Sequence, residues 1–413
     1  MWDNEYLVAG FGEEPIELYG IRQGMPKLNR NIGSGEVSRF YQRNTMYSRP
    51  RDPEKSAPEI LDIGRRHYSV KHFGKTPGYT ARDWAFAMSM WYMERWWGFG
   101  NMVGHEGLLK WYPDQAERAL RDRMEPGGKW EVSDPLEMSR NIKKAALFLG
   151  ASLVGICKLD RRWLYSQRFH PHTREYAPVE IPEEFQYAVV MAHEMPYELM
   201  QTSPAYGGFA STGRGYSMMV FVASSLAHYI RSLGYQAIPT GNDTALSVPI
   251  AIDAGLGELG RNGMLITQQF GPRVRLSKVF TDLPLVPDKP VEFGVTDFCQ
   301  TCRRCAEECP GGCISSGEPT TEGPTISNSN GIYKWYINPE KCLDFWARNN
   351  GSCENCVRAC SFNKLPGRLH DGVRYLVRTA PWLNPLLVRM DKLLGYGKRA
   401  KTEDVWKWAR ARM

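Results

Sequence analysis

The chain lacks any apolar stretch long enough to span a bilayer, because none of its runs reaches about eighteen uninterrupted apolar residues. Its first residues, Met-Trp-Asp-Asn-Glu, form neither the basic nor the apolar region of an export signal. We therefore expect a soluble chain. A start of this kind does not distinguish a cytoplasmic protein from one whose leader has been removed.

Cysteine is nearly absent outside one segment, since nine of the ten cysteines lie between residues 299 and 360. Ten cysteines would suit a disulfide scaffold only in a small secreted chain, and this chain has 413 residues. The clustering indicates metal binding instead. The tenth cysteine, Cys157, ends an apolar stretch, and we expect it to be a buried hydrophobic residue.

Positive charge is concentrated at the C-terminal end. Residues 364–413 carry twelve Lys or Arg against four Asp or Glu, and the whole chain has a net charge of +7. Residues 381–394 and 405–410 mix apolar, aromatic and basic side chains, as an anchor on an anionic membrane would. An amphipathic helix packed on the body with a solvated basic face is the favoured alternative. No recognised nucleic-acid motif accompanies the charge, so we expect no nucleic-acid partner.

The length of the chain predicts two or three domains. Residues 1–135 are rich in Gly, Pro, Arg and Trp and predict an irregular N-terminal region. Residues 136–290 form the core, 291–363 a cysteine-rich module, and 364–413 a basic amphipathic segment. Within the first region, aromatic residues crowd one stretch, either as core or as the lining of an apolar cavity. Its tryptophans are Trp84, Trp91, Trp96, Trp97 and Trp111.

The core region alternates between helical and strand patterns, which predicts an α+β or α/β sandwich. The expected helices cover residues 136–149, 216–233 and 246–254, and the expected strands 151–157, 185–192, 236–239, 264–267 and 273–280. Residues 255–260 spell G-x-G-x-x-G. They follow a short helix and precede Arg-Asn-Gly, so they do not predict a dinucleotide site.

The first cysteine motif is C-x2-C-x2-C-x3-C-P, formed by Cys299, Cys302, Cys305 and Cys309 before a proline. This is the ligand spacing of 4Fe-4S ferredoxins, in which the fourth cysteine ligates the other cluster. Zinc sites also use cysteine pairs, but they need neither the third cysteine nor the following proline.

The second motif repeats the C-x2-C-x3-C pattern after a ten-residue insertion. Exchange of the fourth cysteine predicts two four-ligand sets. One set is Cys299, Cys302, Cys305 and Cys360, and the other is Cys309, Cys342, Cys353 and Cys356. Cys313 is left over, as a residue near the cluster. Two clusters alone need only residues 299–360, so the core should hold another redox centre or a substrate site.

Residues 233–243, 254–263 and 270–284, followed by the paired cysteine motifs, resemble the corrinoid-dependent respiratory reductive dehalogenases in order and spacing. The resemblance covers roughly residues 136–365. It implies an α+β fold, in which a nitroreductase-like cobalamin-binding core adjoins a ferredoxin-like domain with two 4Fe-4S clusters. No Asp-x-His-x-x-Gly motif occurs, which agrees with cobalamin bound base-off.

The resemblance also implies site residues. The family's proton-donating tyrosine falls on Tyr216, its active-site asparagine on Asn242 and its cationic partner on Arg275, while Trp346 matches a tryptophan of the second cysteine motif. Tyr216, Asn242 and Trp346 would contact the cobalamin. From the local sequence, we expect Tyr216 to start a helix after Gly213-Arg-Gly215, and Arg275 to lie on the strand face opposite its apolar neighbours. Taken singly, these would be a helix-start tyrosine, a turn asparagine and a surface arginine.

The implied activity is that of a reductive dehalogenase, the terminal reductase of organohalide respiration. Electrons would pass through an outer and an inner cluster to give cob(I)alamin, which acts on the carbon–halogen bond either at carbon or at the halogen. Tyr216 would supply the proton, and residues 84–111 with Trp346 would wall an apolar pocket. The compact chain favours a small chloroalkane or chloroethene as substrate.

The family's location implies a peripheral protein on the outer face of the cytoplasmic membrane, after removal of a twin-arginine leader that this sequence does not contain. A membrane-side electron donor, a membrane anchor subunit and a homodimer are further expectations. Two alternatives are open. One is an enzyme similar to epoxyqueuosine reductase, which acts on tRNA with an aspartate as its acid; the other is an iron-sulfur electron carrier without its own chemistry.

Overall fold

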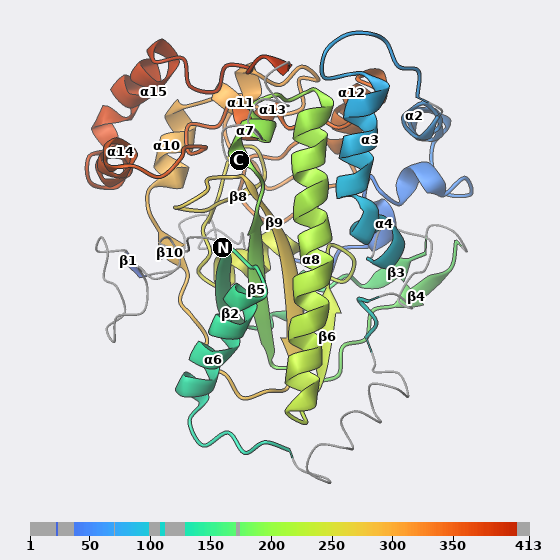
Figure 1. The fold of residues 1–413 in the computed structure, drawn as a ribbon, viewed down its shortest axis with the longest axis vertical. Coiled ribbons are helices and arrows are strands. Elements are labelled where there is room, and N and C mark those ends of the chain that lie inside the picture. Colours follow the sequence, from blue (N-terminus) through green and yellow to red (C-terminus); the bar gives the residue numbers. More distant parts are fainter. Residues whose placement is uncertain are drawn as a thin grey trace.

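The computed structural model describes residues 22–23, 37–69, 71–98, 108–111, 129–170 and 174–402. A four-stranded antiparallel sheet in the order β2-β5-β9-β6 lies at its centre (Figure 1). Its strands are β2 (Leu153–Lys158), β5 (Tyr187–Glu194), β6 (Ala237–Thr240) and β9 (Val274–Thr281).

Helices cover both faces of this sheet, which explains why its strands are apolar almost throughout. The helices α6 (Pro135–Phe148) and α8 (Tyr206–Ser232) pack on one face, together with Val279 of β9. The short helix α9 (Ser247–Asp253) packs on the other face with Leu276 and Phe280. Successive residues of β9 therefore point to opposite helices. The expected α+β core is confirmed.

Most elements of the core lie where the sequence places them. The apolar stretches predicted as strands correspond to β2, β5, β6, β9 and the short β8 (Leu265–Ile266). Residues 255–260 form a turn and β7 (Glu258–Leu259), which pairs with β8, so no helix follows the glycines. Cys157 is buried, as expected.

The start of α8 was predicted wrongly. The helix begins at Tyr206, so Tyr216 lies inside it and not at its first turn. The glycines that suggested a helix start serve close packing instead. A Cβ on Gly213 would lie 2.4 Å from Cδ1 of Trp91, and a Cβ on Gly215 would lie 2.8 Å from Cγ of Arg275.

The N-terminal region is more regular than expected. It contains α2 (Pro58–Tyr68), α3 (Ala81–Met90) and α4 (Tyr92–Trp97). A capping box between Thr80 and Asp83 starts α3, and both α3 and α4 pack along α8 (Figure 1). The remaining short elements are β1 (Arg22–Gln23), η1 (Gln42–Asn44), η2 (Arg49–Arg51), η4 (Arg161–Trp163), β3 (Gln167–Phe169), β4 (Tyr176–Pro178), α7 (Tyr197–Met200) and β10 (Val291–Glu292).

Short helices carry the cysteine motifs at one end of the core (Figure 1). They are α10 (Val295–Thr301), α11 (Arg304–Glu307), α12 (Pro339–Arg348) and α13 (Asn355–Arg358). Arg273, which is fully buried, joins this module to the core. Its Nε donates to Asn363 Oδ1 at 2.9 Å, and its Nη1 donates to the Met195 carbonyl at 2.7 Å. The four-part division of the chain stays a prediction.

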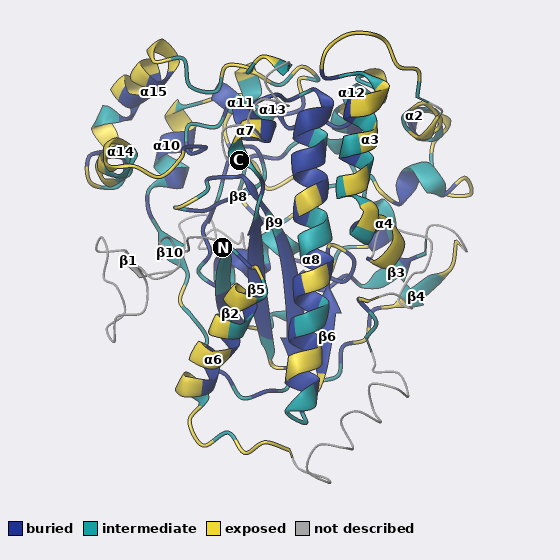
Figure 2. Ribbon diagram, viewed as in Figure 1, coloured by how far each residue is buried: buried dark blue, intermediate teal, exposed yellow. Residues whose placement is uncertain are grey.

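The basic C-terminal segment continues as α14 (Arg368–Thr379), η5 (Pro381–Leu383) and α15 (Asn384–Leu393). Val377, Leu387 and Val388 pack against the cysteine module, whereas Trp382 is 75% and Leu393 85% exposed. Figure 2 shows the exposed side of α15. Residues 405–410 lie outside the described part. Among the described helices, none has both the length and the apolar character of a membrane span.

Candidate functional site

Three of the predicted site residues come together at one end of the central sheet. Tyr216 lies on α8, Asn242 follows β6, and Arg275 lies on β9. The Asn242 amide donates to the Tyr216 hydroxyl at 2.9 Å, and Cζ of Arg275 lies 5.1 Å from the centroid of the Tyr216 ring. As expected, Arg275 lies on the face of β9 opposite Leu276. A phenol, an amide donor and a guanidinium are thus in contact.

The tryptophans of the aromatic stretch have different surroundings. Trp91 stacks on Tyr216, with ring centroids 5.0 Å apart, and its Nε1 donates to the Phe209 carbonyl at 3.1 Å. Trp84 packs on Phe209 and Tyr206. The other three do not contact this site in the described residues: Trp96 and Trp97 are exposed, and Trp111 packs against the core face near α9.

Trp346 is separate from this group. It lies on α12 and packs against Ile60 and Ile63 of α2, and its ring centroid is 6.1 Å from that of His67. Its buried indole nitrogen has no hydrogen-bond partner among the described residues. A contact between Trp346 and a cofactor therefore stays a prediction.

Two residues that the sequence did not suggest connect the site to the cysteine module. Nη2 of Arg275 lies 3.4 Å from Thr212 Oγ1, and Thr212 donates to Glu354 Oε1 at 3.2 Å. Burial raises the pKa of Glu354, whereas Arg275 lowers it. Glu354 directly follows Cys353, so the second cysteine set adjoins the tyrosine site. A carboxylate between two predicted ligands was the one sequence signal for this contact.

Several buried polar atoms on Arg275 and on the residues that flank Asn242 have no partner in the described part of the chain. They are Arg275 Nε, Thr240 Oγ1, Asp243 Oδ2 and Thr244 Oγ1. Buried polar groups in folded proteins are nearly always hydrogen-bonded, so such a group calls for water or a ligand. These atoms include both hydrogen-bond donors and acceptors.

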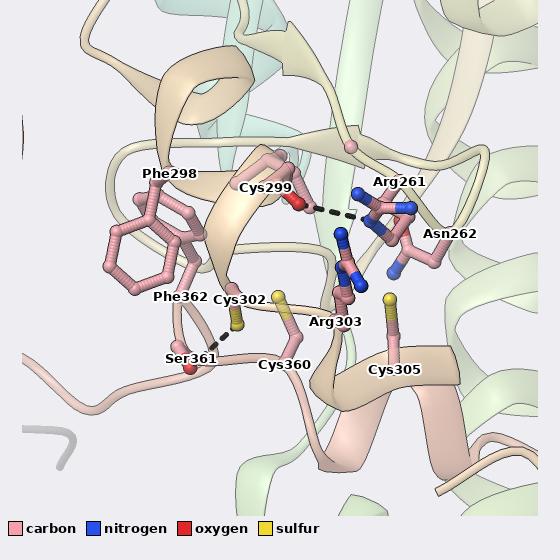
Figure 3. Close-up of a pocket in the computed structure, with 12 residues that line it drawn as sticks. Arg261, Asn262, Phe298, Cys299, Cys302, Arg303, Cys305, Cys360, Ser361 and Phe362 are labelled. Atoms are coloured by element: carbon pink, nitrogen blue, oxygen red, sulfur yellow. Dashed lines mark hydrogen bonds between the residues drawn. The ribbon is translucent and has the colours of Figure 1, made fainter. Parts of the chain in front are cut away.

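The first cysteine set lines a cavity that is partly open to solvent. Figure 3 shows its lining, which includes Cys299, Cys302, Cys305 and Cys360. The residues thus fit a group that binds four thiolates. Cys360 comes from the second motif, as exchange of the fourth cysteine requires. No three Cys, His, Asp or Glu side chains in the described ranges could share a single metal ion.

Arg261 adds positive charge to this cavity. Its Nε donates to the Cys299 carbonyl at 2.9 Å (Figure 3). Its Nη1 donates to the carbonyls of Ser315 and Gly317 at 2.8 and 2.9 Å. The Ser361 hydroxyl lies 3.4 Å from the Cys302 thiol. Cation charge and hydrogen bonds to sulfur are the means by which proteins set cluster potentials.

The second cysteine set lies between this cavity and the tyrosine site. Burial raises the pKa of Cys356, and the nearby Cys309 and Glu354 raise it further. Burial also raises the pKa of Cys353, to about 12, and Cys309 contributes to that increase. Such thiols stay protonated until a metal displaces the proton. The backbone N–H of Cys313 donates to the Cys309 sulfur at 3.3 Å, so this residue adjoins the second set.

Comparisons with known proteins agree with this geometry. The family model of the 4Fe-4S dicluster domain matches residues 298–364. The tetrachloroethene reductive dehalogenase of Sulfurospirillum multivorans is 40% identical over 301 residues, which is 67% of this chain and 60% of that protein. A Desulfitobacterium hafniense protein of the same name is also 40% identical, over 70% of this chain and 59% of the relative.

The solved structure of the catabolic reductive dehalogenase NpRdhA, as its K488Q variant, is 25% identical with a TM-score of 0.69. The match covers 94% of this chain and 50% of that one. An epoxyqueuosine reductase from Bacillus cereus is 32% identical over 111 residues, only 27% of this chain and 28% of that one. This chain spans about 60% of the length of the curated dehalogenases it matches.

Proposed function

Because the chain belongs to the reductive dehalogenase family, we propose that it replaces a halogen by hydrogen on a small organohalide. The contact between Tyr216, Asn242 and Arg275 carries this proposal. Relatives named for tetrachloroethene and trichloroethene favour a chloroethene over a large aromatic substrate. Iron-sulfur clusters and a corrinoid are the cofactors that the family implies.

The proposed mechanism assigns acid chemistry to the protein. A corrinoid bound here would supply reduced cobalt for cleavage of the carbon–halogen bond, and the absence of Asp-x-His-x-x-Gly supports a base-off form. Tyr216 donates a proton to the substrate carbon. Arg275 and the Asn242 amide stabilise the phenolate that remains, as positive charge and hydrogen-bond donors do for a developing anion.

We also propose an order for the two clusters. The set containing Cys353 is the inner one, because Glu354 contacts Thr212 of the tyrosine site. The set containing Cys302 is the outer one, because Ser361 beside it donates to Asp391 of α15 at 2.9 Å. Electrons would enter near α15 and leave near Tyr216.

The exposed face of α14 and α15 supports the proposal of a peripheral protein on the outer face of the cytoplasmic membrane. It presents apolar side chains beside exposed basic residues, a combination that binds anionic lipid. The apolar ones are Leu369, Trp382, Leu386, Met390, Leu393 and Leu394, and the basic ones Arg368, Arg389, Lys392 and Lys398. A membrane-side electron donor, an anchor subunit and a homodimer belong to the same proposal.

Vesicle sedimentation tests this surface. The cofactor-loaded protein should sediment with anionic vesicles more than with neutral ones, and Leu393→Glu should weaken that binding. Phe148→Glu on α6, where the side chain is 92% exposed, is the matched control and should bind as before. Equal loss of binding in both variants would contradict a specific lipid-binding face.

The proposed activity is tested with protein loaded with corrinoid and clusters. About eight irons and one cobalt per chain, with chloride release from tetrachloroethene that depends on Tyr216, would support it. Reduction of an epoxyqueuosine tRNA stem loop without chloride release would favour the tRNA enzyme. Eight irons without cobalt, after preparation with cobalamin present, would leave an electron carrier.

A further inference from the structure

A buried lysine lies behind the tyrosine site. Lys278 of β9 is fully buried and reaches the turn that carries Asn242. Its Nζ donates to the Gly241 carbonyl and, at 2.8 Å, to Ser247 Oγ at the start of α9. The Ser247 hydroxyl in turn donates to Asn242 Oδ1 at 3.1 Å, and Asn242 Nδ2 donates to the Tyr216 hydroxyl at 2.9 Å. A continuous chain of hydrogen bonds thus runs from Lys278 to Tyr216.

The donor and acceptor properties of these groups allow the hydrogen bonds to run in only one direction, from Lys278 to Tyr216. An ammonium group can only donate, so the Ser247 oxygen accepts from Lys278. The hydroxyl proton of Ser247 is then directed to the Asn242 carbonyl oxygen, which can only accept. The amide nitrogen can only donate, so the Tyr216 oxygen is the acceptor. The phenol's own proton is therefore not used by Asn242.

Lys278 keeps its charge at neutral pH despite its burial. Burial lowers its pKa to about 8, and Asp243 acts in the opposite direction. The positive charge of Lys278 polarises each of these hydrogen bonds in the direction of the Tyr216 oxygen. The Gly241 carbonyl, bound by the same ammonium group, also fixes the backbone beside Asn242.

We propose that Lys278 and Ser247 are positioning residues that orient the Asn242 amide as a donor to Tyr216, so that the phenolic proton remains available for the substrate. This inference rests on the proposed function, in which Tyr216 is the acid. When the carbon–halogen bond is cleaved with two electrons from the bound redox cofactors, halide leaves, the Tyr216 O–H bond breaks, and its proton forms a C–H bond with the electron pair on the substrate carbon. The phenolate then accepts a hydrogen bond that is already oriented. A flipped amide would present its oxygen to Tyr216, and that oxygen would accept a hydrogen bond from the phenolic hydroxyl.

Ser247→Ala in the cofactor-loaded protein tests the inference, because it breaks the chain and leaves the buried lysine in place. We expect kcat for chloride release from tetrachloroethene to fall roughly tenfold, with KM changed less than about twofold. Ser247→Thr keeps the hydroxyl and should restore kcat. Ser224→Ala, which removes a hydroxyl bonded only within α8, should leave both constants unchanged. Lys278→Gln, which keeps a donor without the charge, should also lower kcat while changing KM little.

A 19F signal from 3-fluorotyrosine at position 216 reports on the hydrogen bond independently of turnover. We expect the resonance to move in Ser247→Ala, to return in Ser247→Thr and to stay in place in Ser224→Ala. An unmoved resonance, with kcat no lower than in Ser224→Ala, would overturn the inference. A resonance that moves as expected in a protein without dehalogenase activity would uphold the orienting chain and overturn the proposed function.

Discussion

Trp91 lies stacked on Tyr216, with ring centroids 5.0 Å apart and ring planes inclined by 25°. The guanidinium of Arg275 also contacts this ring, and Asn242 holds its hydroxyl. The phenol is therefore held by a ring, a cation and an amide. Among the described residues, the hydroxyl oxygen accepts one hydrogen bond, from Asn242, and that bond does not use the phenolic proton.

Removal of the Trp91 ring should leave the Tyr216 ring less firmly packed. Trp91→Leu loses the ring contact and the hydrogen bond to the Phe209 carbonyl, so the free energy of unfolding should fall by about 1–2 kcal/mol. Urea unfolding measures this, and kcat should fall with it. Trp96→Leu on α4, whose side chain is 45% exposed, should change stability by less than about 0.5 kcal/mol. Equal effects would contradict a specific role for Trp91.

Tyr216→Phe should abolish most of the activity without loss of cofactors. A positioned general acid contributes roughly 100-fold to 10,000-fold in rate, so chloride release should fall within that range. Iron and cobalt contents should match those of the unchanged protein. Tyr229→Phe on the same helix, at a residue that is 37% exposed, should be fully active. A Tyr216→Phe protein with normal kcat would require a different proton donor.

The exchange of cysteines between motifs can be tested one cluster at a time. Cys360→Ala should remove the cluster of the Figure 3 cavity, and Cys353→Ala the other. In each variant the iron content should drop from about eight to about four per chain. Electron paramagnetic resonance should show that different signals are lost. Loss of the same signal in both variants would contradict the assignment.

Arg261 should raise the reduction potential of the outer cluster. Arg261→Gln removes the cation but keeps donors, so that potential should become more negative by on the order of tens of millivolts. Arg261→Lys keeps the charge and should shift it less. A redox titration followed by paramagnetic resonance measures both clusters. A shift confined to the inner cluster would contradict the placement of the two sets.

Acid should destabilise the chain through His193. Burial lowers its pKa to about 3 in the folded state, below the unfolded value near 6.5, so folding favours the neutral ring. The stability from this residue is present above pH 6.5 and is lost as the pH falls toward 3. Relative to His193→Asn, the free energy of unfolding should decrease by about 1.4 kcal/mol per pH unit below 6.5. Denaturant titrations at pH 7, 6 and 5 measure the slope, and parallel curves would contradict it.

The sequence predicted the core well where burial is uniform. The strands β5 and β9 are covered on both faces, so their apolar runs were recognisable without knowledge of their neighbours. The start of α8 was missed because glycine favours turns locally. In the folded chain the same glycines allow contact with Trp91 and Arg275, and tertiary packing overrides the local preference.

The two cysteine ligand sets stay predictions from spacing, and the structure gathers the first set around one cavity. Tyr216, Asn242 and Arg275 were recognised only through family resemblance, and the structure brings all three together. Polar residues that act through contacts between distant segments carry no local pattern. For that reason Thr212, Ser247 and Lys278 could not be predicted, and Glu354 was marked only by its place between two cysteines. The five tryptophans show the same limit, since only packing distinguishes Trp91 from the others.

Arg273 makes the cysteine module and the core dependent on each other. The fully buried guanidinium is hydrogen-bonded to both Asn363 and Met195, and separation of the two parts would break its bond to Asn363. The module is thus not an independent ferredoxin carried beside an enzyme. Denaturant should bleach the clusters and expose the core tryptophans in a single cooperative transition.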